Sequence, residues 1–170
     1  RPVVRLISTG DGRGMPGETP RPDQIIASNT CGLAAMLDAL GAEARILPIA
    51  RDNAASLRTV LSLADGADLV VTIGGASVGD HDLVADVAAE MGMAQSFYKV
   101  AMRPGKPLMA GRLDGTPMVG LPGNPVSAMV CGTVFLAPML RAMMGLPAAP
   151  APQVRRTLSD PLPANGPPAH

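Results

Sequence analysis

One segment constrains the fold more than any other, the apolar run Asp68-Leu69-Val70-Val71-Thr72-Ile73 followed by two glycines. A continuous apolar run of this length, bounded by turn residues, is typical of a strand buried on both faces of a parallel sheet. Shorter runs predict further strands at residues 3–7, 44–49 and 95–100. A hairpin is predicted from 108–113 and 116–120, joined by an Asp114-Gly115 turn.

Apolar residues at helical spacing separate these strands and predict helices near 28–40, 53–64, 83–91 and 125–144. Ser28 or Asn29 is expected to cap the first helix, and Asp52 or Asn53 the second. Pro138 is expected to kink the last helix or end it early.

The alternation of strands and helices predicts an α/β fold with a mostly parallel central sheet, helices on both faces and one β-hairpin. Residues 1–147 are interpreted as this domain. Residues 148–170 are rich in proline and alanine, and we interpret them as a linker and the clipped start of a further module.

Composition narrows the classes of partner. Lys+Arg and Asp+Glu balance at 14 each, and the aromatic residues are only Phe97, Tyr98 and Phe135, which argues against nucleic acid. No apolar run is judged to approach the ~20 residues of a membrane span. Cys31 and Cys131 lie in apolar stretches, are interpreted as buried thiols, and fit a reducing cytoplasm.

Unusual segments fall where the predicted strands end, which is where open α/β sheets bind ligands. These segments are 8–11, 50–53, 74–82, 101–107 and 120–127. In the third of them, Gly74 and Gly75 leave backbone N–H groups bare for a phosphate-bearing ligand, and Ser77 adds a hydroxyl. A tight turn without a ligand is the alternative.

Three aspartates, Asp52, Asp80 and Asp82, could offer hard oxygen ligands to Mg²⁺, or the last two could cap the following helix. Three cations, Lys99, Arg103 and Lys106, form the one local concentration of positive charge; the alternative is a solvated basic loop.

The segment Leu121-Pro122-Gly123-Asn124-Pro125 leads into a predicted helix whose N-terminal amides favour anions, and Ser127 falls in its first turn. No Ser–His–Asp, Cys–His or zinc-ligand spacing is visible, so covalent catalysis and zinc chemistry are not expected.

Seven motifs, found in order between about Val3 and Gly145, resemble those of the molybdopterin molybdenumtransferase family (MoeA and the gephyrin E domain). They are Ser-Thr-Gly-Asp at 8–11, Pro-Gly-Glu at 16–18, Ser-Asn at 28–29, Arg-Asp at 51–52, Gly-Gly-Ala-Ser-Val-Gly-Asp-His-Asp at 74–82, Lys-Val-Ala-Met-Arg-Pro-Gly-Lys-Pro at 99–107 and Gly-Leu-Pro-Gly-Asn-Pro-Val-Ser at 120–127. The last two are long and specific. The tail at 162–166 also resembles the start of that family's C-terminal β domain.

The resemblance implies a three-layer α/β/α fold, shared with a related adenylyltransferase. It implies insertion of molybdate into adenylyl-molybdopterin with release of AMP, assisted by Mg²⁺. A homodimer, a link to the adenylyltransferase and a cytoplasmic location are also implied.

By motif position, the resemblance assigns roles to individual residues. Asp52 and Asp82 match metal-site carboxylates and, with Lys99 and Lys106, the catalytic set. The expected ligand-binding residues are Thr9, Gly10, Asp11, Gly74, Gly75, Ser77, Gly79, Arg103, Lys106, Pro122, Gly123, Asn124, Pro125 and Ser127. Within that set, Arg103, Lys106 and Ser127 match the molybdate side.

Two positions depart from the family pattern. The family usually reads Gly-Asp-Glu-Leu in the first loop, whereas Gly12 and Arg13 follow Asp11 here, and Ala27 replaces a common acidic residue. These losses keep a second reading open, a molybdopterin-binding or scaffold domain without turnover. A third is a relative of the adenylyltransferase.

Overall fold

A six-stranded sheet forms the centre of the computed structural model, which describes residues 1–14, 17, 19, 25–75, 82–149, 154–157 and 159–161. The strand order is β4-β1-β5-β8-β7-β6. The strands are β1 (Val3–Ser8), β4 (Glu43–Ile46), β5 (Leu69–Ile73), β6 (Ala94–Tyr98), β7 (Met109–Leu113) and β8 (Thr116–Leu121). The first four in the order are parallel, and β7 runs antiparallel to both of its neighbours.

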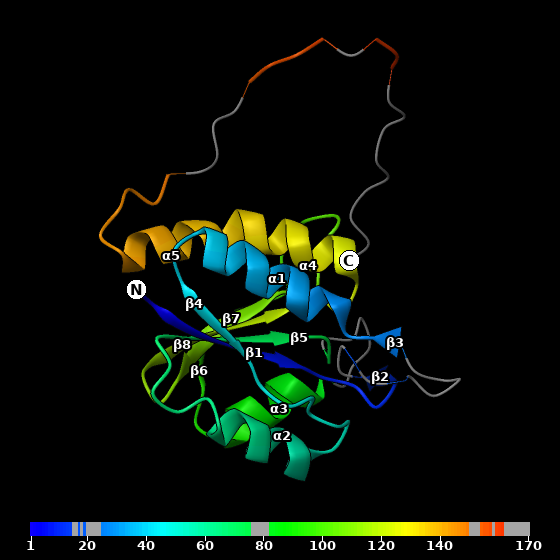
Figure 1. The fold of residues 1–170 in the computed structure, drawn as a ribbon, viewed down its shortest axis with the longest axis vertical. Helices are drawn as coiled ribbons and strands as arrows, with labels where there is room; N and C mark the ends of the chain where they lie inside the picture. Colours follow the sequence, from blue (N-terminus) through cyan, green and yellow to red (C-terminus); the bar gives the residue numbers. More distant parts are fainter. Residues whose placement is uncertain are drawn as a thin grey trace.

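Helices cover both faces of this sheet (Figure 1). On one face lie α1 (Ser28–Ala39) and a long helix composed of α4 (Pro125–Cys131), η1 (Gly132–Leu136) and α5 (Ala137–Met143). On the other face lie α2 (Ala54–Ser62) and α3 (Leu83–Glu90). The architecture therefore has three layers, α/β/α, and the predicted fold class is confirmed.

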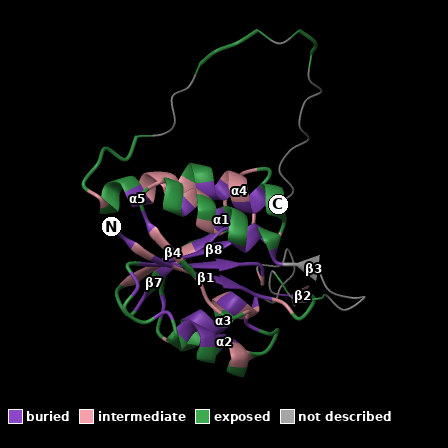
Figure 2. Ribbon diagram, viewed as in Figure 1, coloured by how far each residue is buried: buried purple, intermediate pink, exposed green. Residues whose placement is uncertain are grey.

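The core is split by the sheet into two apolar clusters, as the buried inner faces in Figure 2 show. Residues of β5 contribute to both clusters, and all five are buried. This is the pattern expected of a central parallel strand. Leu33 and Leu37 from α1 and Leu136 from the long helix fill one cluster, while Leu57 and Val84 fill the other.

Several strand boundaries in the structure differ from those predicted from the sequence. The strand predicted at 44–49 ends at Ile46, two residues before Pro48, which cannot donate a ladder hydrogen bond. The strand predicted at 95–100 ends at Tyr98, because Lys99 takes a positive φ of 67°. Two short strands in the first loop, β2 (Arg13–Gly14) and β3 (Ile25–Ile26), pair in parallel and were not predicted.

The predicted cap of the first helix is wrong. Ala27 occupies the N-cap position and offers no side-chain hydrogen bond. Asn29 is instead 7% exposed and donates its amide to the carbonyl of Gly123, 94 residues away. Asn53 caps α2 by accepting from Ser56 N, as one of the two predicted alternatives requires.

The long helix Pro125–Met143 passes through Pro138 without ending. The segment Gly132–Leu136, which ends two residues before Pro138, adopts π-helical bonding, and Ala137 N donates to Gly132 O. The missing proline N–H is therefore accommodated by a wider turn. With 19 residues and a mean hydropathy of 1.6, this helix is, by length and composition alone, sufficient to cross a membrane. This contrasts with the sequence, from which no apolar segment of that length is predicted. It packs on the sheet through Cys131, Leu136 and Leu140, which are fully buried.

The two cysteines differ. Cys131 is buried, as expected, and burial raises the pKa of its thiol. Cys31 is exposed on α1, so its predicted burial is wrong. The described residues after Leu146 form no helix or strand, and their interpretation as a linker and further module stays a prediction.

We predict that Leu33→Ala lowers the free energy of unfolding by about 2–5 kcal/mol, because Leu33 is fully buried between α1 and the sheet. Leu63→Ala is the matched control, since Leu63 is 53% exposed, and should change stability by no more than about 0.5 kcal/mol. Chemical denaturation measures both values, and equal losses in the two variants would contradict the described core.

Candidate functional site

The ends of four strands are joined directly at the carboxyl edge of the sheet. Thr9 N, after β1, donates to Ile73 O at 3.1 Å, and Gly74 N, after β5, donates to Leu121 O at 3.0 Å. Gly10 N donates to Ala50 O at 3.0 Å, which brings in the loop after β4. The expected convergence of these strand ends is therefore confirmed.

A cavity of about 270 Å³ opens at this edge. It is lined by Gly10, Gly12, Arg13, Ser28, Asn29, Gly123 and Pro125. Sequence reasoning did not assign Arg13 and Asn29 to the site. An arginine inside a glycine-rich strand-end loop was the available signal for Arg13. For Asn29 the signal was the Ser-Asn motif at 28–29, which does not reveal the distant partner Gly123.

Arg13 and Asn29 hold the loop after β8. Asn29 Nδ2 donates to Gly123 O at 2.8 Å, and Arg13 Nη2 donates to the same oxygen at 3.2 Å. These two bonds tie α1 and β2 to the turn that begins the long helix. The turn after β8 is therefore fixed by side chains from the N-terminal third of the chain.

Glycines at this edge leave room that a side chain would fill. A Cβ on Gly75, which has a φ of +72°, would lie 2.4 Å from Val84 Cγ2 and 2.9 Å from Thr9 Oγ1. A Cβ on Gly123 would lie 2.9 Å from Arg13 Nη2. Bare backbone is thus required here by close packing, as well as being suited to the approach of an anion.

Two threonine hydroxyls near the strand ends have no described hydrogen-bond partner. Thr9 Oγ1 and Thr72 Oγ1 are both buried and unpaired among the described residues. Thr9 Oγ1 lies beside the Gly74-Gly75 turn, and Thr72 Oγ1 would lie 3.3 Å from a Cβ on Gly120. Buried unpaired polar groups are rare enough that each calls for an explanation, and a ligand is one.

The long helix begins at the cavity. Asn124 caps it by accepting from Ser127 N at 3.1 Å, and Pro125 occupies its first turn. Ser127 is 9% exposed and its hydroxyl lies 3.4 Å from Asn124 Oδ1. Together with the helix dipole, these groups make the helix start favourable for an anion.

The carboxylates fall into two separate arrangements. Asp11 and Asp52 are exposed and exchange bonds: Asp11 N donates to Asp52 Oδ2 at 3.3 Å, and Asp52 N donates to Asp11 Oδ1 at 3.2 Å. Asp82 is 5% exposed, caps α3 by accepting from Ala85 N, and accepts from the Tyr98 hydroxyl at 3.1 Å. The described bonds of Asp52 therefore join it to Asp11, while both oxygens of Asp82 are engaged elsewhere.

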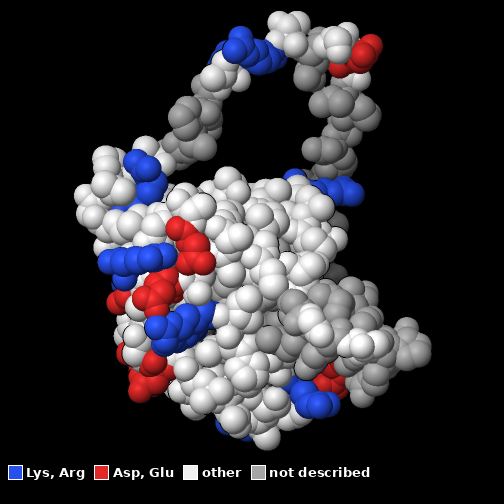
Figure 3. Space-filling model, in the orientation of Figure 1, with Lys and Arg blue, Asp and Glu red and all other residues white. Residues whose placement is uncertain are grey.

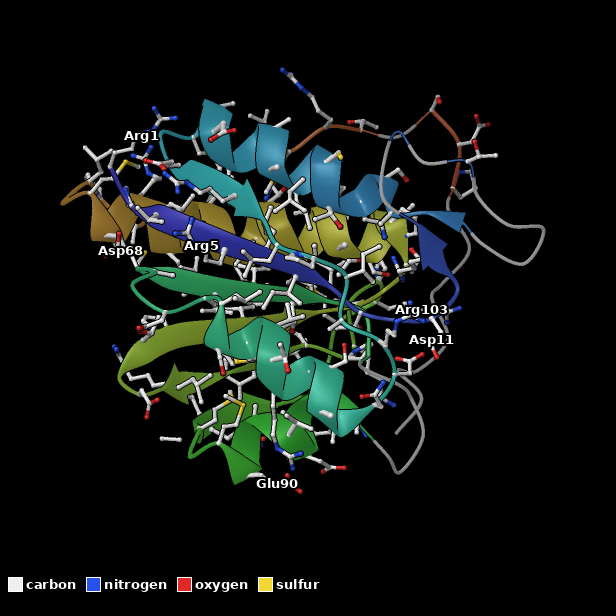
Figure 4. The ribbon with its side chains drawn as sticks, turned by 60° about the horizontal axis from the view of Figure 1, so that its bottom comes forward. Arg1, Arg5, Asp11, Asp68, Glu90 and Arg103 are labelled. Atoms are coloured by element: carbon white, nitrogen blue, oxygen red, sulfur yellow. The ribbon has the colours of Figure 1, made fainter. Side chains whose placement is uncertain are left out.

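The cations follow β6. Lys99 is exposed and places Nζ 4.8 Å from the centre of the Tyr98 ring. The backbone carbonyl of Lys106 accepts from Val100 N and Leu108 N, each at 3.0 Å, which shapes the basic loop. Arg103 is exposed and lies at the same end of the sheet as Asp11, opposite Arg1 and Asp68 (Figure 4). In Figure 3 the visible surface over α1 is mostly white, and many of the charged side chains gather at the left, near the N-terminus and β4.

Three candidate site positions, Ser77, Gly79 and Asp80, lie outside the described residues. Their roles stay predictions.

Comparison with known proteins decides the family. A sequence profile described as a probable molybdopterin binding domain matches residues 5–142. The chain belongs to the molybdopterin-binding domain family.

Members of the family with assigned names cover most of this chain. "Molybdopterin molybdenumtransferase 2" of Mycobacterium tuberculosis is 42% identical over 153 residues, covering 86% of this chain and 38% of the relative. The Haemophilus influenzae molybdopterin molybdenumtransferase is 36% identical over 143 residues, covering 84% and 35%. The chain thus spans less than two fifths of the length of these relatives.

Solved structures agree with the family assignment. The molybdopterin biosynthesis MoeA protein from Pyrococcus horikoshii matches with a TM-score of 0.78 at 35% identity, over 85% of this chain and 36% of that one. A molybdopterin biosynthesis protein from Mycobacterium abscessus matches with a TM-score of 0.65 at 16% identity, over 85% and 94%. The second similarity shows the fold alone.

We predict that Gly75→Ala costs more stability than Gly66→Ala, although both glycines have a φ of +72°. At Gly66 the added methyl group meets nothing within 4 Å, so the loss is the backbone cost of about 1–2 kcal/mol. At Gly75 the clash with Val84 adds about 1–3 kcal/mol. Denaturation curves that give equal losses would contradict the packing of this turn.

The chain contains one tyrosine and no tryptophan, so the ionisation of Tyr98 is directly observable by ultraviolet absorbance. Burial, and then the charge of Asp82, raise the pKa of Tyr98 to about 12. Asp82→Asn should move the midpoint back towards the ordinary value of about 10. A wild-type midpoint near that value, unchanged in the variant, would contradict the described contact.

The sign of the stability effect follows from the raised pKa. The protonated phenol favours the folded state, so its contribution is complete below pH about 10 and is lost as the pH rises towards about 12.

Proposed function

We propose that this chain is the molybdopterin-binding part of a molybdopterin molybdenumtransferase, which inserts molybdate into adenylyl-molybdopterin and releases AMP. The observation that carries the proposal is the cavity at the carboxyl edge, where the glycine backbone of Gly10, Gly12 and Gly123 meets the start of the long helix at Pro125. Both features suit a phosphate group. The names of the relatives over this same segment support the pterin and the reaction.

In this proposal the glycine turns hold the phosphate or nucleotide of the substrate. Gly10, Gly74 and Gly75 present main chain on one side, and the turn from Pro122 to Pro125 presents the helix start on the other. Thr9 supplies a hydroxyl from beneath. Ser77 and Gly79 are proposed for the same role from their position in the loop after β5.

Molybdate is proposed to bind on the side of the basic loop. It is a divalent oxyanion, so positioned cations and hydroxyls suit it. Arg103 and Lys106 are the cations proposed to contact it, and Ser127 is the hydroxyl at the start of the long helix. Lys99 is proposed to act in the catalytic set from the adjoining end of β6.

The donor set at the edge fits Mg²⁺ only in part. The described residues contain no group of three or more His, Cys, Asp or Glu side chains able to hold a metal. Mg²⁺ commonly uses one or two carboxylates, with substrate phosphates and waters completing its shell. The exposed carboxylates of Asp11 and Asp52 fit that description, and Mg²⁺ bound there would neutralise charge on the phosphoanhydride.

Asp82 is proposed to act at the same edge as a metal ligand. Because both of its carboxylate oxygens already accept hydrogen bonds, we also propose that it positions neighbouring parts of the site. One oxygen fixes the start of α3 and the other holds Tyr98, the last residue of β6. Asp82 thereby connects the loop after β5 with the strand that leads to Lys99.

The remaining proposals concern the cellular setting. The assigned names of relatives support a biosynthetic enzyme, and two free cysteines fit a reducing cytoplasm. A homodimer and an association with the molybdopterin adenylyltransferase are proposed from the family resemblance.

A second candidate is a domain that binds molybdopterin without turnover. It is favoured by Gly12 and Ala27, which stand where the family usually carries acidic residues. The two candidates share ligand binding and differ in AMP release.

We predict that Asp52→Asn lowers AMP release by about 10- to 100-fold in the protein as encoded by its gene, assayed with adenylyl-molybdopterin, molybdate and Mg²⁺. The amide removes a negative charge and a hard oxygen ligand while keeping the shape of the side chain. Raising the Mg²⁺ concentration should restore part of the rate.

Asp65→Asn is the matched control. Asp65 is exposed and precedes β5, at the end of the sheet opposite the cavity. Among the described bonds, its side chain accepts only from Gly66 N. Its rate should equal that of the wild type. Molybdopterin binding without any AMP release in the wild type would establish the second candidate instead, and absence of both would refute the proposal.

A further inference from the structure

The side chain of Arg13 lies across the glycine turns of three strands. Its Nη2 would be 2.9 Å from a Cβ on Gly123 and 3.4 Å from one on Gly74, and its Nε would be 3.6 Å from one on Gly10. These glycines follow β8, β5 and β1 respectively. The guanidinium is therefore placed over the centre of the carboxyl edge, where it also lines the cavity.

No carboxylate neutralises this guanidinium among the described residues. The described ion pairs join Arg1 to Asp38, Arg45 to Glu43 and Arg58 to Glu90. Asp11, two residues away, is bonded to the main chain of Asp52 instead. Arg13 makes one described hydrogen bond, from Nη2 to Gly123 O, although a guanidinium carries five N–H donors.

The threonine beneath the glycines is a second, independent observation. Thr9 is 2% exposed, and its Oγ1 has no described partner. That oxygen would lie 3.1 Å from a Cβ on Gly74 and 2.9 Å from one on Gly75. An unpaired hydroxyl and an unneutralised cation thus both lie beside Gly74.

We propose that Arg13 is an anion-binding residue of this cavity, which receives a phosphate-type oxyanion between its free N–H groups and the start of the long helix. Arginine suits this task because its planar fork donates two parallel bonds to such a group. The bond to Gly123 O holds the fork in place before the anion arrives, so less conformational entropy is lost on binding.

The described lining of the cavity contains the cation of Arg13 and no carboxylate. This makes the edge positive at that point and favours tight holding of a phosphate. That the bound phosphate belongs to molybdopterin rests on the proposed function. That the site binds a phosphate-type oxyanion does not.

The test is a calorimetric titration of this chain at low ionic strength, first with inorganic phosphate and, separately, with AMP. Arg13→Gln keeps a donor for Gly123 O but removes the charge, and should weaken binding of both probes by about 10-fold or more. Arg13→Lys keeps the charge without the fork and should fall between Arg13→Gln and the wild type.

Arg112→Gln is the matched control. Arg112 is exposed, donates to a glycine carbonyl, that of Gly115 at 2.8 Å, and lies at the hairpin turn on the opposite edge of the sheet. This variant should bind both probes as the wild type does. Equal weakening in the two glutamine variants would mean that overall charge, and not this site, holds the anion, and would overturn the proposal.

A direct readout guards against misfolding of the variants. In the wild-type chain, the side-chain Nε–H signal of Arg13 in a nitrogen-15 NMR spectrum should shift saturably on addition of phosphate. The signal is assigned by its absence in Arg13→Lys. A signal that stays in place while phosphate binds would overturn the proposal without any variant affinity being needed.

The outcome can be separated from that of the proposed function. If the gene-encoded protein releases AMP and its Arg13→Gln variant does so with an unchanged KM, the proposed role of Arg13 is wrong and the proposed function stands. If Arg13 binds phosphate but AMP is never released, the enzymatic proposal fails and the anion site stands.

Discussion

The contact on which the site depends is the pair of hydrogen bonds that Arg13 and Asn29 donate to the carbonyl of Gly123. Parallel pairing places the ends of β1, β5 and β8 at one edge, but pairing alone does not fix the turn that follows β8. The two side chains do so from 110 and 94 residues away. The start of the long helix is thereby held against the glycine turns, and the cavity has a defined shape.

Glycine has two roles at this edge, and they have the same physical origin. The absence of a Cβ at Gly123 lets the Arg13 guanidinium lie against the main chain, and its absence at Gly75 lets Val84 and Thr9 pack closely. The same absence leaves backbone N–H groups accessible to an anion. The packing therefore requires glycine at these strand ends, and in the proposed function the same glycines form the surface that binds the anion. A substitution there is expected to affect both stability and binding.

Sequence patterns sufficed for the features that depend on local chemistry. The buried run of β5, the Asp114-Gly115 hairpin and the cap of α2 by Asn53 are confirmed because each is set by a few adjacent residues. The roles of Asn29 and Arg13 were missed because their partner, Gly123, is far away in sequence. Similarly, the passage of the long helix through Pro138 depends on a π-helical segment that no local preference indicates.

The central claim is that the cavity at the carboxyl edge binds the phosphate of a pterin substrate. A crystal structure of the chain with molybdopterin bound measures this most directly. The account predicts the phosphate between Arg13, the Gly74-Gly75 turn and the start of the long helix at Pro125. A phosphate bound elsewhere, with this cavity filled only by water, would contradict it.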